Sequence, residues 1–200
     1  VESPIDAVPS ICLGVCDLKL SEMVGAMSTF ANKGVYIKPM FITKIEDRNG
    51  NVIARFSAEE SEAMSEVTAY KMVELMKGVV QSGTGIRLRY YYNFNNPIAG
   101  KTGTTQRQSD GYFMGITPDL TTGVWVGAED RSVHFRSTQL GQGSRTALPI
   151  WALYMREVYN DPGLKISKGD FTKPISQDTD LNFNCDQYDT EESTEFLDEF

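Results

Sequence analysis

One stretch of this 200-residue sequence governs its interpretation: Ala99-Gly100-Lys101-Thr102-Gly103-Thr104-Thr105. Its Gly-Lys-Thr part also ends the phosphate-binding P-loop, in which backbone N–H groups and a helix N-terminus face the phosphates. That loop requires a glycine five residues before Gly100, where this chain has Asn95, and a helix directly after the lysine. The residues that follow Lys101 are poor helix formers. A P-loop is therefore excluded on both counts.

The same stretch suits a β-strand, in which successive side chains alternate between two faces. Lys101 and Gly103 would share one face, and Thr102 and Thr104 the other. On an edge strand beside a cleft, this pattern offers an ammonium group, hydroxyls for a substrate carboxylate and free backbone N–H groups, while Gly103 lets a substrate backbone approach. Such groups suit acyl transfer, where a carboxylate is anchored and an oxyanion is stabilised. An isolated Lys-Thr-Gly favours an ordinary strand with an exposed lysine, so the surrounding sequence decides.

Helices and a hairpin are predicted on either side of this stretch. Apolar residues recur at helical spacing in three segments, which are residues 18–31, 66–80 and 148–159. Between the first two, Asn49-Gly50 separates β-type residues within 35–56 and predicts a hairpin. The polar residues 58–65 predict a loop, and Gly83 and Gly85 are expected to permit positive φ after the second helix.

The remaining segments predict a sheet and its connections. Three short β-type runs predict an antiparallel meander: residues 98–105, 112–117 and 122–128, with a turn at Pro118-Asp119. Connections or irregular structure are expected in three further places, residues 1–18, 87–96 and 141–145.

A series of short motifs surrounds Lys101 in a fixed order. Lys-Thr-Gly is one of three motifs of serine β-lactamases and penicillin-binding proteins, beside Ser-x-x-Lys and Ser-x-Asn. The flanking sequence resembles the class A, high-molecular-weight penicillin-binding proteins in particular, with order and spacing kept over residues 3–159. The matching stretches are residues 10–14, 20–39, 44–50, 79–85, 99–105, 113–118, 123–127 and 145–151.

The resemblance implies a fold, an activity and a set of site residues. The implied fold is α+β, of the penicillin-binding protein and serine β-lactamase type, with antiparallel sheet strands flanked by helices. The implied activity is that of a peptidoglycan D,D-transpeptidase, which joins stem peptides through a serine acyl-enzyme and is acylated by β-lactam antibiotics. Lys101 and Thr104 would be catalytic, with the N–H of Thr104 as half of the oxyanion hole. Substrate binding would fall to Thr102, Gly103, Thr104 and Thr105; no metal and no cofactor is implied.

The other two motifs of the family do not occur in this chain. None of its serines is followed by lysine at the third position or by asparagine at the second. We therefore expect residues 1–160 to be the C-terminal half of a transpeptidase domain, inactive alone and partnered by the missing N-terminal half. Residues 161–200 are expected to be an acidic tail that is disordered or loosely attached.

The parent protein implied by the resemblance is a bifunctional glycosyltransferase and transpeptidase. It would be held by an N-terminal membrane anchor at the extracytoplasmic, periplasmic face of the bacterial inner membrane. A non-catalytic sensor or scaffold on the same fold is the alternative. A β-lactamase is disfavoured, because Trp125 and residues 149–151 lie in synthase-like stretches.

Composition narrows the possible partners. Nine of the 27 acidic residues and none of the 19 basic residues lie between 176 and 200, so the net charge of −8 comes from the C-terminus. The remaining chain is nearly neutral, which argues against nucleic acid as a partner. No apolar run approaches the roughly 20 residues that cross a bilayer.

A few residues invite a function that their context does not support. Cys12, Cys16 and Cys185 have no zinc spacing and are expected to be buried free thiols. His134 lies in a polar stretch and is expected at the surface. The run Tyr90-Tyr91-Tyr92 favours core or loop packing over a substrate groove.

Two features concern the sheet itself. Asp110-Gly111 stands where relatives often have Asp-Ala, which would loosen the start of a strand. The strand of Trp125 would be an exposed apolar edge if the N-terminal half were absent, and such edges favour aggregation.

Overall fold

The centre of the fold is a three-stranded antiparallel sheet. The computed structural model describes residues 1–176 and 179. In this part of the chain, β5 (Ala99–Thr104), β6 (Gly111–Ile116) and β7 (Thr121–Val126) lie in the order β5-β6-β7. The register pairs Thr102 with Phe113 and Phe113 with Val124. The predicted meander is confirmed, and β5 lies at one edge of it.

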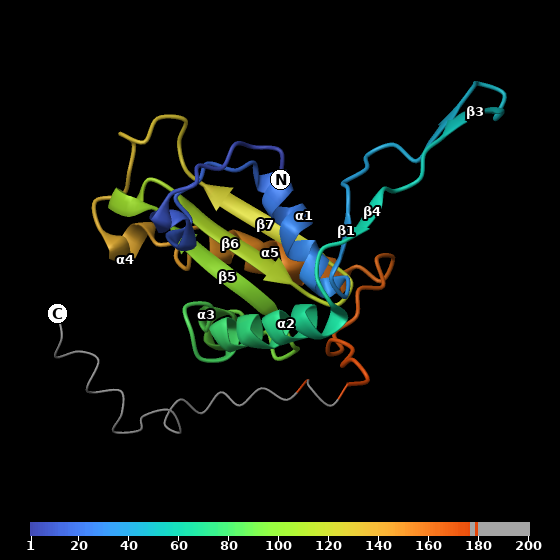
Figure 1. The fold of residues 1–200 in the computed structure, drawn as a ribbon. Helices are drawn as coiled ribbons and strands as arrows, with labels where there is room; N and C mark the ends of the chain where they lie inside the picture. Colours follow the sequence, from blue (N-terminus) through green and yellow to red (C-terminus); the bar gives the residue numbers. More distant parts are fainter. Residues whose placement is uncertain (177–178, 180–200) are drawn as a thin grey trace.

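Helices flank the sheet on both faces and along one edge (Figure 1). α5 (Ala147–Asn160) packs on one face, α1 (Leu20–Ala31) crosses the other, and α2 (Glu66–Gln81) runs beside β5. All three agree with the helices predicted from apolar spacing. The α+β class, with antiparallel strands flanked by helices, is confirmed.

The main core lies between the sheet and α5. Phe113 and Trp151 are fully buried there, with ring centroids 5.2 Å apart in an edge-to-face arrangement. A Cβ at Gly115 would lie 2.3 Å from the Trp151 ring, so the indole occupies the space above this glycine. Burying a side chain such as Phe113 stabilises a fold by about 1.5–3 kcal/mol. The face of β6 is thereby fixed against α5, and β5 is fixed through β6.

Two short antiparallel strand pairs, the outer one a hairpin, form an arm that projects from the body (Figure 1). β1 (Val35–Ile37) pairs with β4 (Glu60–Glu62), and β2 (Lys44–Glu46) pairs with β3 (Val52–Arg55). The outer turn is closed by Asp47, whose carboxylate accepts hydrogen bonds from Asn51 and Asn49. These bonds, those from Asn51 first, hold the pKa of Asp47 below its usual value. The predicted Asn-Gly hairpin is confirmed.

Two sequence-based expectations are wrong in this region. β4 lies inside the predicted loop 58–65; its side chains are all exposed, so no apolar alternation marked it as a strand. Gly83 and Gly85 do not use positive φ, which among the described glycines occurs at Gly14, Gly34 and Gly50.

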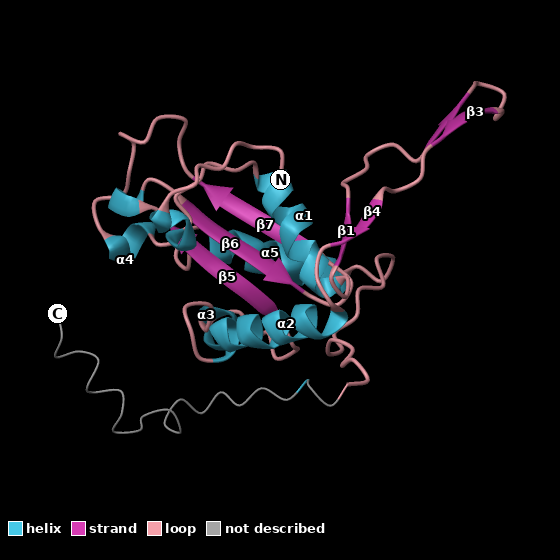
Figure 2. Cartoon of the chain, in the orientation of Figure 1, coloured by secondary structure: helices cyan, strands magenta, loops and turns pink. Residues whose placement is uncertain are grey.

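Short helical turns lie between the longer elements (Figure 2). They are η1 (Pro9–Leu13), α3 (Arg87–Tyr90), η2 (Gln106–Gln108) and α4 (Thr138–Gly141). Two of them, η1 and α3, lie inside predicted connections. A helix of one turn is too short to display a period of apolar residues, so its apolar spacing carries no signal.

Residues 161–176 form a strap that follows α5 and lies against the body. Phe171 packs beside the buried residues Val73 and Ile116, and the N–H of Ser167 donates to the Asp119 carboxylate over 2.8 Å. The predicted acidic tail begins with this segment. Its residues 177–178 and 180–200 lie outside the described residues.

The cysteines agree with prediction only in part. Cys12 and Cys16 are free, but Cys12 is exposed and Cys16 is only partly covered, so their predicted burial is wrong. The reason is that η1 buries none of its residues. Cys185 lies outside the described residues.

Candidate active site

The outer edge of β5 carries the predicted site residues. Within the described residues, no strand pairs with this edge. The N–H of Thr105 donates across to the carbonyl of Asp110, and N–H directions alternate along a strand. The N–H of Thr104 and the carbonyl of Thr102 are therefore directed to the open side. An unpaired N–H on a fixed strand is the kind of donor that stabilises a developing oxyanion.

The two predicted substrate hydroxyls lie on one face of β5. Thr102 pairs with Phe113 in the register and so shares the face covered by α5, and Thr104 lies two residues further along the same face. Each hydroxyl contacts a different loop: the Thr102 and Thr84 hydroxyl oxygens are 2.6 Å apart, and the Gly143 N–H donates to Thr104 over 3.0 Å. Both threonines are thus held by residues distant in sequence.

Lys101 lies on the opposite face of β5 and is exposed. Its ammonium group turns toward the strand edge, where it donates to the carbonyl oxygen of Thr102 over 2.8 Å. The predicted alternation of Lys101 against Thr102 and Thr104 is confirmed by the register. This edge therefore carries one cation, two hydroxyls and the outward N–H of Thr104, the group expected to meet an oxyanion.

Gly143 allows the loop before α5 to touch this strand. A Cβ at this position would lie 2.3 Å from the carbonyl oxygens of Gly103 and Tyr112. Such a distance is far below a van der Waals contact, so only glycine fits. This closeness is what brings the Gly143 N–H to Thr104.

Thr105 ends the strand by binding within its own loop. Its hydroxyl contacts the Ser109 hydroxyl over 2.9 Å and donates to the Asp110 carboxylate over 3.1 Å. Asp110 also accepts hydrogen bonds from Ser109 and from the Trp125 indole. Burial raises the pKa of Asp110, but these three hydrogen bonds outweigh it and hold the pKa below its usual value. The carboxylate therefore ties the start of β6 to the ends of β5 and β7.

Gly111 follows directly and explains the departure from the common Asp-Ala. A Cβ at Gly111 would lie 2.1 Å from the Thr146 hydroxyl oxygen. The loop before α5 therefore packs onto this position, and β6 begins regularly at Gly111. The expected loosening of the strand start is wrong.

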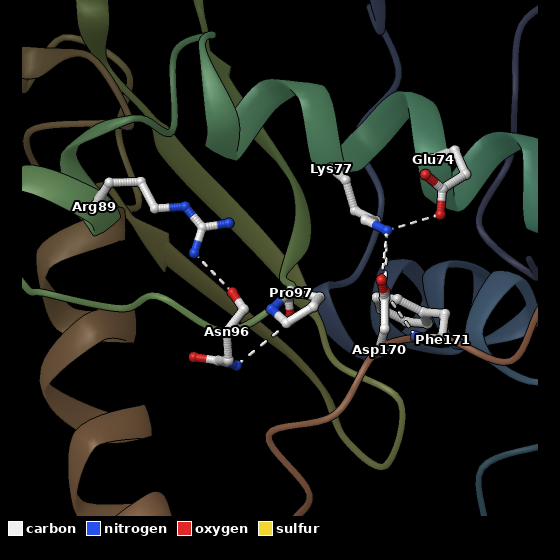
Figure 3. Close-up of polar contacts among 7 residues, drawn as sticks. All are labelled: Glu74, Lys77, Arg89, Asn96, Pro97, Asp170 and Phe171. Atoms are coloured by element: carbon white, nitrogen blue, oxygen red, sulfur yellow. Dashed lines mark hydrogen bonds and ion pairs between the residues drawn. The ribbon is translucent and has the colours of Figure 1, made fainter.

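Two polar clusters secure the elements on either side of β5 (Figure 3). On α2, the buried Lys77 binds Glu74 over 2.8 Å and Asp170 of the strap over 3.0 Å. In the segment before β5, Arg89 donates to the carbonyls of Phe94 and Asn96, and burial lowers the Arg89 pKa. These contacts fix where β5 begins and where α2 lies beside it.

Other residues considered from the sequence do not join the site. His134 is exposed and its ring contacts the carbonyl of Phe135. Tyr90 and Tyr91 are exposed, and Tyr91 stacks under the guanidinium of Arg87 at 4.4 Å. Tyr92 packs on the main core. Within the described residues, no three His, Cys, Asp or Glu side chains gather as metal ligands.

Two surface hollows lie elsewhere on the molecule. One hollow lies at the base of the arm beside Pro39 and Phe56, and another lies between α1 and α2 beside Phe30 and Tyr70. Neither is lined by a residue of β5. The described helices include none that is long and apolar enough to span a bilayer.

Comparison with known proteins assigns the family. The family model described as "Penicillin binding protein transpeptidase domain" matches residues 13–147. The chain belongs to the penicillin-binding protein transpeptidase family. The match includes the whole of β5 and both loops that contact its threonines, so the site described above lies inside the family domain.

Relatives agree in sequence and in structure. "Penicillin-binding protein 1A" of Aquifex aeolicus is 37% identical over 152 residues, covering 74% of this chain and 20% of that protein. The protein of that name from Rickettsia prowazekii is 30% identical over 198 residues, covering 86% of this chain and 24% of that protein. The chain thus spans about a fifth to a quarter of these relatives and is part of a transpeptidase domain.

Solved structures confirm the predicted fold. Penicillin-binding protein 1A from Haemophilus influenzae superposes with a TM-score of 0.70 at 22% identity, covering 78% of this chain and 29% of that one. The penicillin-binding protein PonA1 from Mycobacterium tuberculosis superposes with a TM-score of 0.68 at 25% identity, covering 84% of this chain and 44% of that one. The penicillin-binding protein type of α+β fold is therefore established for this chain.

Sequence reasoning missed two residues of the site, Thr84 and Gly143. Both were placed in connecting loops. Thr84 lies in the stretch 79–85 that resembles the family, whereas Gly143 lies just before the stretch 145–151. Motif order was the only available signal for Thr84, because no periodicity links positions 18 residues apart.

Proposed function

We propose that this chain is the C-terminal half of the transpeptidase domain of a bifunctional cell-wall synthase. Its β5 edge would bind the stem peptide that donates the acyl group. The observation that carries this proposal is the edge of β5 with which no described strand pairs. Lys101, Thr102 and Thr104 lie together there, beside the Thr104 N–H that points away from β6. Family membership supports the same activity.

The reaction requires a serine from the N-terminal half of the domain. That serine attacks the carbonyl carbon of the penultimate D-Ala, and the carbonyl oxygen takes up negative charge. The N–H of Thr104 donates to this oxyanion; one such donor typically lowers a barrier by about 2.7–4 kcal/mol. The bond to the terminal D-Ala then breaks, and an amine of a neighbouring stem peptide later takes the acyl group.

The substrate carboxylate is anchored by the two hydroxyls. Thr102 and Thr104 point to one face of the strand, so both can donate to the terminal D-Ala carboxylate or to the carboxylate of a β-lactam. Lys101 adds positive potential at the same edge and attracts the anion. On the face of Lys101, Gly103 leaves the strand surface free of a side chain, so a substrate backbone can come close there. Thr105 supports the strand end, since its hydroxyl is bonded to Ser109 and Asp110.

The proposed substrate also implies a cellular setting. Stem peptides are assembled into the wall outside the cytoplasm, so the domain would work at the extracytoplasmic, periplasmic face of the inner membrane, held there by an N-terminal anchor of the parent protein. No cofactor or metal is needed, because the chemistry consists of nucleophilic attack and proton transfer.

Acylation kinetics test the proposal. In the full-length protein, Lys101→Ala and Thr104→Val should each slow labelling by a fluorescent penicillin about tenfold or more, because each removes a donor to a charged group. Lys44→Ala on the projecting arm is the matched control and should label at the wild-type rate. Unchanged labelling of both site variants would refute the roles given to Lys101 and Thr104.

A non-catalytic sensor or scaffold is the second candidate. It is favoured by one observation, the lack of Ser-x-x-Lys and Ser-x-Asn in this chain. The coding sequence upstream of Val1 distinguishes the two candidates. Both motifs should be found there if the chain is part of a synthase, and a transpeptidase region without them would favour the sensor or scaffold.

A further inference from the structure

The loop after α2 brings a third hydroxyl to the β5 edge. α2 ends at Gln81, and the N–H groups of Gly83 and Gly85 donate back to the carbonyls of Gly78 and Val79. The loop is wound tightly: a Cβ at Gly83 would lie 2.9 Å from the Cα of Val79, and one at Gly85 would lie 3.1 Å from its carbonyl oxygen. Thr84 is thereby held over β5.

The contact between Thr84 and Thr102 is a short hydrogen bond. Their hydroxyl oxygens are 2.6 Å apart, and either can be the donor. A hydroxyl has one proton to donate and can accept two hydrogen bonds. If Thr102 donated to Thr84, its proton would be unavailable to a substrate carboxylate, which can only accept.

At Thr104, the direction of the corresponding hydrogen bond is unambiguous. Its hydroxyl oxygen accepts a hydrogen bond from the Gly143 N–H, a group that can only donate. The proton of Thr104 is therefore free for a ligand. Thr84 can do the same for Thr102 by donating to it, and accepting this bond also polarises the Thr102 O–H.

We propose that Thr84 is a positioning residue that donates to Thr102 and thereby makes the Thr102 hydroxyl a donor to the substrate carboxylate. This inference rests on the proposed function. Thr102 and Thr104 are two residues apart on one face, about 6.7 Å along the strand. Two hydrogen bonds of about 2.7 Å leave room between these hydroxyls for a carboxylate that receives one from each. Gly143 and Thr84 then orient the pair from opposite sides.

The proposal makes a specific claim about substrate dependence. Thr84→Val keeps the side-chain shape but removes the donor, so Thr102 can turn its proton elsewhere. For a penicillin with a free carboxylate, we expect the apparent dissociation constant for the full-length protein to rise roughly fivefold to tenfold. The limiting acylation rate should change less than twofold, because Thr84 does not touch the reacting carbonyl. Thr84→Ser retains the hydroxyl and should restore wild-type binding.

The control variant and the control ligand separate positioning from loop packing. Ser82→Ala lies in the same loop, where its hydroxyl reaches only the Gly78 carbonyl at 3.5 Å, and it should bind as wild type does. The methyl ester of the same penicillin lacks the carboxylate, so wild type and Thr84→Val should label with it at equal rates. Thermal unfolding of each variant checks that the domain remains folded.

Each outcome decides a different point. Unchanged binding of the free acid by Thr84→Val would overturn the role of Thr84 and leave the proposed function intact. Equal losses with the acid and the ester, or failure of Thr84→Ser to rescue, would show that Thr84 only packs the loop and would also overturn its positioning role. If the wild-type protein did not distinguish the acid from the ester, the carboxylate site of the proposed function would itself fall.

Discussion

At the scale of single residues, Gly143 supports the site through its backbone alone. A side chain there would collide with the carbonyl oxygens of Gly103 and Tyr112, 2.3 Å from its Cβ. Gly143→Ala should therefore displace the loop and break the hydrogen bond that the N–H of residue 143 donates to the Thr104 hydroxyl. We expect labelling of the full-length protein by a fluorescent penicillin to slow at least tenfold, and the free energy of unfolding to fall by about 1–3 kcal/mol. Stopped-flow labelling and urea unfolding measure the two effects.

Gly78 provides a matched glycine for this experiment. It lies inside α2, and a Cβ there would have no atom within 4 Å. Gly78→Ala should raise the free energy of unfolding by up to about 1 kcal/mol, because alanine favours the helix, and should leave labelling unchanged. Wild-type labelling by Gly143→Ala would show that Thr104 does not depend on this loop.

The site residues differ in how far the sequence alone could predict them. The faces of Lys101, Thr102 and Thr104 follow from strand alternation, a local rule that needs no tertiary information. The partners Thr84 and Gly143 depend on where the end of α2 and the loop before α5 come to rest. Those positions are set by packing, such as Trp151 over Gly115, which no local pattern encodes.

At the scale of elements, the strap 161–176 is fixed to α2 by a buried charge. Lys77 is only 8% exposed and binds both Glu74 and Asp170. Asp170→Ala leaves this ammonium with one partner and should lower the free energy of unfolding by about 1 kcal/mol, a small value because Asp170 is half exposed. Lys77→Met removes the charge but keeps a buried stem, and should stay within about 1 kcal/mol of wild type.

Urea unfolding gives the measurement, with the surface pair Lys33–Glu66 as its control. The Lys33 ammonium and the Glu66 carboxylate are 3.1 Å apart, and both side chains are well exposed. Lys33→Ala should therefore lower the free energy of unfolding by at most about 0.5 kcal/mol. A loss no larger for Asp170→Ala than for Lys33→Ala would show that the strap is not held by Lys77.

The ion pair between Lys77 and Asp170 should make the stability of the fold depend on pH. Burial lowers the pKa of Lys77, but the hydrogen bonds to Glu74 and Asp170 outweigh it and hold the pKa above its ordinary value of 10.5. A raised pKa contributes stability that is complete below the unfolded pKa and disappears as pH rises through the folded one. The difference between wild type and Asp170→Ala should therefore be constant near neutral pH and shrink only above a pH of about 10.5.

Elements with one apolar face were predictable, and the polar ones were not. α1, α2 and α5 each bury a stripe of residues, so their spacing marks them. β4 buries nothing and exists because its backbone pairs with β1, a partner 25 residues away. An element could therefore be predicted from the sequence where it buries apolar side chains, and not from the secondary-structure propensity of its residues.

At the scale of the whole molecule, both edges of the sheet remain unpaired within the described residues. β5 and β7 are its outer strands, and Trp125 on β7 is 42% exposed. An open strand beside an exposed indole is a template for pairing with another chain. Since the chain spans about a fifth to a quarter of its curated relatives, these two edges are where we expect the N-terminal half of the domain to pack.

The isolated 200-residue chain should therefore associate with itself and remain unacylated. Incubation with penicillin should give no penicilloyl adduct by mass spectrometry, because no serine of this chain stands in a Ser-x-x-Lys motif. Sedimentation should show concentration-dependent oligomers, as expected for an open sheet edge. Co-expression with the preceding half of the domain should yield a soluble complex that labels, and Lys101→Ala in this chain should slow that labelling. An adduct on the isolated chain would refute the division of the site between the two halves, and a monomer at high concentration would refute the open edge.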